Sequence, residues 1–272
     1  TSCRSGKGID YLKTLIGREI GALLNRRDAI PESWFRVKEA IEAETRGRDF
    51  IGDDDYEAAC TKHGVYDHDA REALIRLLHE LGSVVCFCDD PRLMNIGILN
   101  PEWVTDGVYA ILTNDDLAKN RGKLERQDLR AMLDPQRYPV GKHSYLLDLM
   151  EKFELCFEYD GEPSGRYLVA DLLDPEQPKF DWPSHDEVRF VYEYSILPPS
   201  IISRFIVRNH RYLNGVSPWK TGAVLKIDTA DVWVAANEAD RRITIAVTGS
   251  NTNMRRGAMT TVRKELERIV GL

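Results

Sequence analysis

Apolar residues recur at helical spacing through the first part of the chain. The first predicted helix has apolar positions three or four residues apart, at Ile9, Leu12, Ile16, Ile20 and Leu24. A second helix is predicted after Pro31, because proline is favoured in the first helical turn. Asp67 can cap a third, and Gly82 can adopt the left-handed conformation that ends it. The chain therefore opens as a series of amphipathic helices.

Short apolar runs separated by turn residues predict strands over residues 84–88, 95–99, 155–159 and 167–172. We expect the first two to form one hairpin and the last two another. A helix is predicted from Asn100 to Ile111, and a further one over residues 144–153 should precede the second hairpin. Helices followed by a two-strand wing are typical of a winged-helix-like unit.

The pattern changes after a segment that contains three prolines, residues 174–184, which indicates a linker. Beyond it, alternation predicts strands over residues 188–194, 223–227, 232–236 and 243–247. Helices are predicted over residues 200–213 and at the C-terminus. We predict an α+β fold, in which a helical first half with small winged-helix-like antiparallel sheets is followed by the linker and by an antiparallel sheet with packed helices.

Charge divides along the same boundary. Residues 188–272 hold 13 of the 37 Lys and Arg residues and 7 of the 44 Asp and Glu residues, a net charge of +6. Residues 1–187 then carry −13, within a total of −7. Such asymmetry indicates separate surfaces with separate partners.

The composition is that of an ordinary globular protein. The 272 residues are 43% apolar and 30% charged, which excludes disordered and collagen-like chains and allows two domains. No apolar run approaches the ~18 residues of a membrane span, and no signal pattern opens the chain, so we expect a cytoplasmic protein. The odd number of five cysteines favours reduced thiols.

Catalytic and metal-binding signals are weak. The turn at residues 5–8 lacks the spacing of a phosphate-binding loop, and no nucleophile signature is present. The acidic run at residues 53–55 lacks the pattern of a calcium loop and is expected to begin a solvated helix. Zinc-ligand residue types occur in loose proximity, at Cys60, His63, His68, Cys86 and Cys88. Packing in the core is the favoured interpretation of these residues, and we expect neither enzyme nor metal chemistry.

A basic stripe is predicted on the helix that follows the linker. Arg204, Arg208 and Arg211 share one face, opposite an apolar one. An anionic partner would suit this stripe. A solvated face, or pairing with the acidic first half of the same chain, is the favoured alternative because charged faces are usually solvated.

Several motifs resemble those of one known family. Residues 30–34 (IPESW), 100–109 (NPEWVTDGVY), 146–154 (LLDLMEKFE) and 197–205 (LPPSIISRF) closely resemble the COR domain of Roco proteins. COR stands for C-terminal of Roc, and Roc is the Ras-like GTPase domain of that family. Ser2, Cys3 and Arg4 resemble the last guanine-contacting loop of a Ras-like protein.

The resemblance implies a division of the chain. Residues 1–25 would be the C-terminal end of Roc, residues 26–175 COR-A, residues 176–187 a linker and residues 188–272 COR-B. The chain begins at Thr1, and we expect it to belong to a longer protein. The resemblance also implies a GTPase parent, with GTP or GDP and Mg bound in its Roc domain, and with leucine-rich repeats. No cofactor is expected within this segment.

The implied function is that of a non-catalytic domain that links homodimerisation through COR-B to the GTPase cycle of the adjacent Roc domain. Tyr192 is the expected Roc contact. The alternative, which stays open, is that Tyr192 packs in the core of its own domain. The expected dimer interface comprises apolar positions of one strand and one helix, Ile243, Ile245, Val247, Met259, Val262 and Leu266. If those faces pack within COR-B, loops such as residues 214–219 would form the interface instead.

A winged-helix nucleic-acid-binding module is the competing hypothesis. Its recognition helix would cover residues 144–153. The negative charges of Asp148 and Glu151 in this helix would repel the phosphate backbone of a nucleic acid. The net negative charge of the first half of the chain also disfavours nucleic-acid binding. We therefore expect no nucleic-acid partner.

Overall fold

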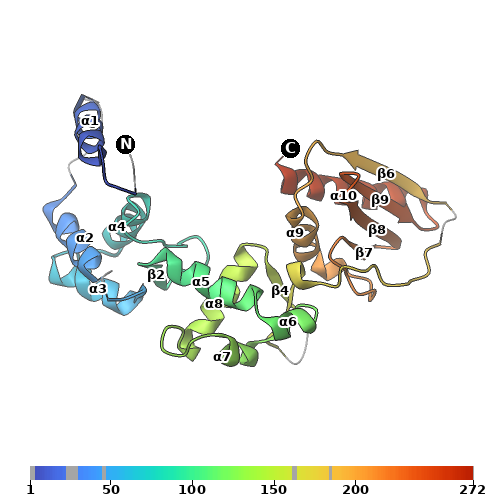
Figure 1. Ribbon diagram of the computed structural model, residues 1–272, viewed down its shortest axis with the longest axis horizontal. Coiled ribbons are helices and arrows are strands. Elements are labelled where there is room, and N and C mark those ends of the chain that lie inside the picture. The colour runs from blue at the N-terminus through green and yellow to red at the C-terminus, as the bar shows by residue number, and fades with distance from the viewer. Residues whose placement is uncertain (1–3, 23–29, 45–46, 161–163, 184–185, 272) are drawn as a thin grey trace.

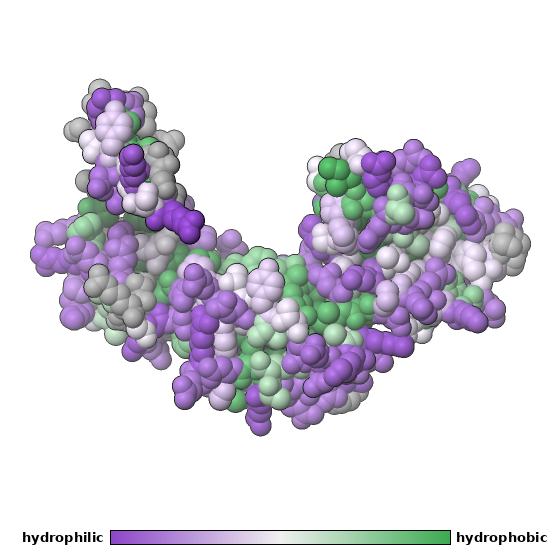
Figure 2. Space-filling view, viewed as in Figure 1, coloured by the Kyte–Doolittle hydropathy of each residue, from purple (hydrophilic) through white to green (hydrophobic). Residues whose placement is uncertain are grey.

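The computed structural model describes residues 4–22, 30–44, 47–160, 164–183 and 186–271. Helices with short strands occupy one end and the middle of an elongated molecule, and a larger sheet with two helices occupies the other end (Figure 1). The α+β prediction is confirmed. The surface is hollowed between the two ends, and apolar residues gather in the middle part (Figure 2). Within the described ranges, no helix has the length and apolar character that crossing a membrane requires.

The α-helices of the described residues are α1 (Ile9–Ala22), α2 (Glu32–Glu44), α3 (Asp53–Lys62), α4 (His68–Glu80), α5 (Pro101–Leu112), α6 (Asp115–Lys119), α7 (Leu129–Met132), α8 (His143–Lys152), α9 (Ser200–Arg208) and α10 (Thr252–Val270). The strands are β1 (Phe50–Gly52), β2 (Ile96–Ile98), β3 (Lys123–Glu125), β4 (Cys156–Glu158), β5 (Arg166–Val169), β6 (Val188–Glu193), β7 (Gly222–Ile227), β8 (Ala230–Asn237) and β9 (Arg242–Thr248). Short 3₁₀ turns cover Arg126–Asp128, Val140–Lys142, Ala170–Leu172 and His210–Tyr212.

Capping residues set the helix boundaries where the sequence predicts them. The Asp67 side chain accepts a hydrogen bond from the backbone N–H of Ala70 at 2.9 Å, and α4 begins there. Gly82 follows the end of α4 with a φ of 74°, a left-handed conformation that glycine takes without steric cost. Asn100 caps α5 through the backbone N–H of Glu102.

The first small sheet differs from the predicted hairpin. Strand β2 pairs antiparallel with β1, and residues 84–88 contribute only the isolated bridge between Val85 and Ile98. The β1 strand is three residues long, too short for its alternation to be recognised in the sequence. Its central residue, Ile51, lies in a hydrophobic cluster with α2, α3 and α4.

The second small sheet has the order β3-β5-β4 and is antiparallel throughout. Both predicted wing strands are present, and β3 is an additional strand. Successive residues of a strand point to opposite faces. On β5, Tyr167 and Val169 join the cluster formed with α5 and α8, whereas Leu168 between them joins the cluster of the larger sheet. This sheet is therefore a wall shared by two hydrophobic cores.

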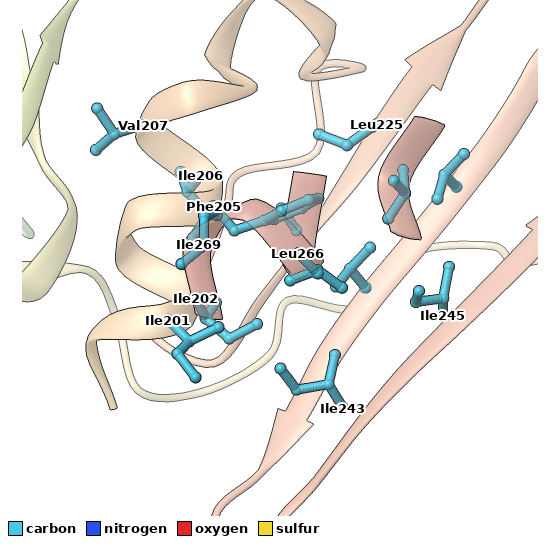
Figure 3. Packing of buried hydrophobic residues seen from close by; sticks show 14 of the residues in the cluster. Ile201, Ile202, Phe205, Ile206, Val207, Leu225, Ile243, Ile245, Leu266 and Ile269 are labelled. Atoms are coloured by element: carbon cyan, nitrogen blue, oxygen red, sulfur yellow. The ribbon is translucent and has the colours of Figure 1, made fainter. Parts of the chain in front are cut away.

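The larger sheet has the order β6-β9-β8-β7, with antiparallel pairing between all neighbours. Helices α9 and α10 pack on one of its faces, where Phe205 and Leu266 are fully buried beside the strand residues Ile243 and Ile245 (Figure 3). The linker packs against this domain, since the ring of Phe180 lies 6.1 Å from that of the buried Trp219.

The expectation of reduced thiols is wrong for two cysteines. Cys86 and Cys88 form a disulfide bond, whereas Cys60 and Cys156 are free and buried. The Cα atoms of Cys86 and Cys88 lie 5.5 Å apart, a separation that a disulfide bond spans. Burial raises the pKa of the Cys60 thiol, as expected of a residue packed in the core.

Candidate functional site

The strongest candidate site is the junction between the shared sheet and the larger domain. Phe157 of β4 stacks on the imidazole of His210, with ring centroids 4.6 Å apart. Phe157 belongs to the same buried cluster as Ile202 and Phe205 of α9. Apolar contacts therefore join the two halves of the chain across this junction.

An ion cluster lies beside these apolar contacts. The Glu154 carboxylate accepts a hydrogen bond from Nε of Arg204 at 2.6 Å and one from Nη1 of Arg208 at 3.0 Å. Arg208 also donates from Nε to Oε1 of Glu265 on α10, at 2.5 Å. The residues Glu154, Arg204, Arg208 and Glu265, called the junction cluster below, connect the end of α8 to α9 and α10.

Within the junction cluster, the neighbouring carboxylates favour the charged form of Arg208. Burial works against the charge of Arg208, but the carboxylates of Glu265 and Glu154 outweigh it and raise the pKa of Arg208. Side chains of both carboxylates are mostly removed from solvent, at 22% exposure for Glu154 and 16% for Glu265. Bonds of this charge-assisted kind are stronger than neutral ones.

This geometry decides between the interpretations of the basic stripe. Arg204 and Arg208 pair with the acidic first half of the same chain, through Glu154, as the favoured alternative predicts. Arg211 is exposed and does not belong to the junction cluster. Sequence reasoning did not identify Glu154 as the partner, because the pairing joins residues 50 and 54 positions apart.

Tyr192 lies on β6 and faces α10. Its hydroxyl donates to Oε1 of Glu267 at 2.7 Å and accepts from Nε of Arg263 at 3.2 Å. Phe190, Tyr192 and Tyr194 share one face, as alternation predicts, and pack against the cluster beneath. Burial raises the pKa of the Tyr192 hydroxyl. The ring is half-buried, so it is both a packing residue and partly accessible.

The structure corrects the expected dimer interface. The strand and helix positions named for it pack against each other inside the larger domain, because the apolar faces of β9 and α10 meet. All of them are buried: Ile243, Ile245, Val247, Met259, Val262 and Leu266. They are not available to a second copy of the chain.

The accessible apolar residues of this domain lie elsewhere. Strand β6 is an edge of the sheet, and Val191 on it is 42% exposed. Ile196, just beyond the strand, is 77% exposed. The other edge, β7, is partly covered by bridges from Leu213 and Trp219. Edge position was the missing information, since the sequence does not show which strand is outermost.

The remaining candidates form no site. Ser2 and Cys3 lie outside the described residues, and Arg4 is exposed in a turn. Among the residues that the structure describes, no group of His, Cys, Asp and Glu side chains could hold a metal ion. Helix α8 does not suit nucleic-acid recognition, because most of it is buried and its acidic residues Asp148 and Glu151 pair with Arg92.

Comparisons with known proteins agree with this architecture. Residues 31–173 match the family described as C-terminal of Roc, COR-A domain, and residues 185–271 match C-terminal of Roc, COR-B domain. A solved structure of Methanosarcina barkeri Roco2 RocCORdC bound to GDP is similar, with 31% identity and a TM-score of 0.52, over 63% of this chain and 53% of that one.

Two curated relatives are much longer proteins. The probable serine/threonine-protein kinase pats1 of Dictyostelium discoideum is 26% identical over 98% of this chain and 9% of its own length. A Roc-COR-CHAT protease of Runella zeae is 25% identical over 75% of this chain and 22% of its own length. The chain thus spans less than a quarter of each.

Proposed function

This chain belongs to the COR domain family of Roco proteins, and from that premise we propose that it is a non-catalytic domain that couples homodimerisation to the nucleotide cycle of an adjacent Roc GTPase domain. The protein from Methanosarcina barkeri is described as RocCOR bound to GDP. In this proposal GTP or GDP, with Mg, binds in the Roc domain of the parent, and the described residues transmit its state.

The observation that carries the proposal is the shared wall between the two halves. Leu168 is buried in the core of the second half, and its neighbours Tyr167 and Val169 are buried in that of the first. Protein interiors are close-packed, so a displacement of β5 is felt in both cores. The junction cluster adds a charge-assisted link at the same place. Movement imposed on COR-A by Roc would thereby reach COR-B.

We assign the Roc contact to two surfaces. Leu12 and Ile16 form an exposed apolar stripe on α1, which we attribute to the last helix of Roc and expect the rest of that domain to cover. Tyr192, half-buried beside Arg263, is the proposed contact on COR-B. In this proposal residues 1–25 belong to Roc, residues 26–175 to COR-A, residues 176–187 to the linker and residues 188–272 to COR-B.

We assign the dimer contact to the β6 edge. An exposed edge strand offers unpaired backbone groups to a second strand, and natural proteins usually protect such edges. Val191 and Ile196 add accessible apolar surface there. A symmetric pairing of two β6 strands would cover both features at once, as in other two-fold interfaces.

Sedimentation velocity of the 272-residue chain tests the dimer contact. The unaltered chain should sediment as a dimer at tens of micromolar, and Val191→Asp should sediment as a monomer with an unchanged circular dichroism spectrum. Val140→Asp is the matched control, since Val140 is 54% exposed and lies in the first half. A Val191→Asp chain that remains dimeric would remove β6 from the interface, and a monomeric unaltered chain would remove dimerisation from the proposal.

A further inference from the structure

The disulfide bond between Cys86 and Cys88 encloses a single residue, Phe87. The chain entropy that a cross-link removes from the unfolded state grows with the number of residues in the closed loop. This bond therefore stabilises the fold much less than one that closes a long loop. Its direct effect is local, because it ties the backbone on both sides of Phe87. What depends on the disulfide is the placement of the Phe87 ring.

The two ends of the disulfide differ in accessibility. Cys86 is buried, and its backbone N–H donates a hydrogen bond to Nδ1 of His79 at 3.3 Å. Cys88 is half-buried and lines a pocket of about 130 Å³ between α3 and α4. A cavity of about 150 Å³ holds a molecule as large as benzene, so this pocket has room for a small thiol. A thiol from solvent can therefore approach Cys88 in the folded protein.

The Phe87 ring packs on the end of α8. It contacts the Phe153 ring edge to face, with centroids 5.7 Å apart, and Nζ of Lys152 lies 5.7 Å from the centre of the Phe87 ring. Phe153 directly precedes Glu154, whose carboxylate accepts the hydrogen bond from Arg204 in the junction cluster. A single ring contact therefore separates the residue enclosed by the disulfide from the junction cluster.

We propose that Cys86 and Cys88 form a redox-modification site, at which thiol–disulfide exchange with a small thiol changes the position of Phe87 and, through Phe153, the junction cluster. The thiolate of the small thiol attacks the sulfur of Cys88, the bond between the two protein sulfurs breaks, and Cys86 leaves as a thiolate that takes a proton from solvent. A second thiol then attacks the small-molecule sulfur of the mixed disulfide and releases Cys88. Two small thiols are thereby oxidised to one disulfide, and the protein disulfide is reduced to two thiols.

Reduction removes one of the constraints on Phe87. The bridge between Val85 and Ile98 still holds the chain before Cys86, whereas the backbone that follows is no longer tied to it. We expect the Phe87 ring to leave its contact with Phe153 and the junction cluster to rearrange. This inference concerns the structure of the junction and does not depend on dimerisation or on coupling to Roc.

The first measurement is the rate at which 2-mercaptoethanol reduces the 272-residue chain, followed by alkylation and mass spectrometry. If thiols reach Cys88 in the folded protein, cleavage should proceed within about ten-fold of its rate in concentrated urea. Cleavage that requires global unfolding would be at least about 10³-fold slower. Rapid alkylation of both Cys86 and Cys88 would support the site, and the slower rate would refute it.

The second measurement compares NMR spectra of the oxidised and reduced chain. Reduction should shift the amide resonance of Glu154 and the Nε–H resonance of Arg204. The Nε–H resonance of Arg189, which donates to Glu187 in the second domain's own ion pair, should stay in place. Shifts confined to residues 84–90 would refute the link to the junction cluster.

Two variants identify the thiols responsible. The double variant Cys86→Ser with Cys88→Ser should give the spectrum of the reduced chain and no response to 2-mercaptoethanol. Cys60→Ala is the matched control, since it removes a buried free thiol from the same half and should keep the full response. A response that persists in the double variant would assign the effect to another thiol and contradict the proposal. The comparison of the oxidised and reduced unaltered chain does not depend on how well the variants fold.

Discussion

The carboxylate of Glu154 accepts a hydrogen bond from Nε of Arg204 at 2.6 Å, and the backbone of Glu154 is left-handed, with a φ of 59°. This conformation costs a non-glycine residue about 1–2 kcal/mol. Glycine would fit the turn after α8 better but could not reach the arginines. The side chain that joins the two halves is thus held at a position that is unfavourable for its own backbone.

Substitutions at Glu154 should separate these two effects. Glu154→Ala loses the junction cluster and keeps the unfavourable backbone, so the free energy of unfolding should fall by about 2–3 kcal/mol. Glu154→Gly loses the same contacts but relieves the backbone, and should be less destabilising than Glu154→Ala by about 1 kcal/mol. Urea unfolding measures both. Arg211→Ala, at an exposed position, should change the free energy by less than about 0.5 kcal/mol. The opposite order of the Gly and Ala variants would show that φ at this position carries no cost.

Leu168→Ala should affect both halves together. The substitution removes a buried side chain from the wall that separates the cores and should cost about 2–5 kcal/mol. Trp103 lies in the first core and Trp219 in the second domain, so each can report on its own half once the other tryptophans are replaced by phenylalanine. We expect both reporters to shift to the same lower urea midpoint. A shift confined to Trp219 would show that the halves unfold independently.

Two substitutions at Tyr192 separate its role in the fold from its proposed role in Roc association, and the first of them is Tyr192→Phe. It removes the hydroxyl that bridges Arg263 and Glu267, and should cost about 1 kcal/mol of stability. The ring contacts with Phe190 and Tyr194 remain. In the parent protein, Tyr192→Ala should weaken association between Roc and COR at least several-fold, whereas Tyr194→Phe should not. Unaltered association in Tyr192→Ala, with the fold intact, would move the Roc contact elsewhere.

Glu187 provides a pH-dependent link between the linker and β6. The hydrogen bond from Arg189, then that from the Trp182 indole, hold the pKa of Glu187 below its ordinary value of 4.5. A depressed pKa adds stability above the unfolded pKa, and that stability is lost as pH falls through the folded value. Glu187→Gln should therefore lower the free energy of unfolding by about 1–2 kcal/mol at pH 7 and by much less near pH 3.

The control for this pH effect is Glu193→Gln. Glu193 pairs with Arg242 on the surface, at 70% side-chain exposure, and should change stability by less than about 0.5 kcal/mol at either pH. Unfolding can be followed through tryptophan fluorescence. An equal loss for Glu187→Gln at both pH values would mean that its ionised form is not what stabilises the linker.

The elements that the sequence predicts well are those whose signals are local. The caps at Asp67 and Asn100 and the alternation of β7, β8 and β9 each lie within a few residues. Strand β1 was missed because three residues are too few to show a period. The dimer positions were misassigned because an apolar face in a sequence does not reveal what covers it. The faces of β9 and α10 cover each other.

The junction illustrates the same limit for the candidate site. Alternation on β5 predicts two faces, but not that each face enters a different core. The arginines of α9 were recognised as a stripe, and their partner Glu154 was not. Glu154 can pair with the arginines of α9, which are 50 and 54 positions away in the sequence, only because α9 packs against the shared sheet. That packing depends on the complete fold.

The most direct test of the account is the nucleotide dependence of the dimer in the parent protein. Sedimentation equilibrium with GDP and with a non-hydrolysable GTP analogue should give two different dimer dissociation constants. In Glu154→Gln the protein should still bind nucleotide and still dimerise, but the two constants should converge, because the link between the halves is weakened. If the variant keeps the full difference between the two nucleotides, the junction does not couple Roc to the dimer and the central claim is contradicted.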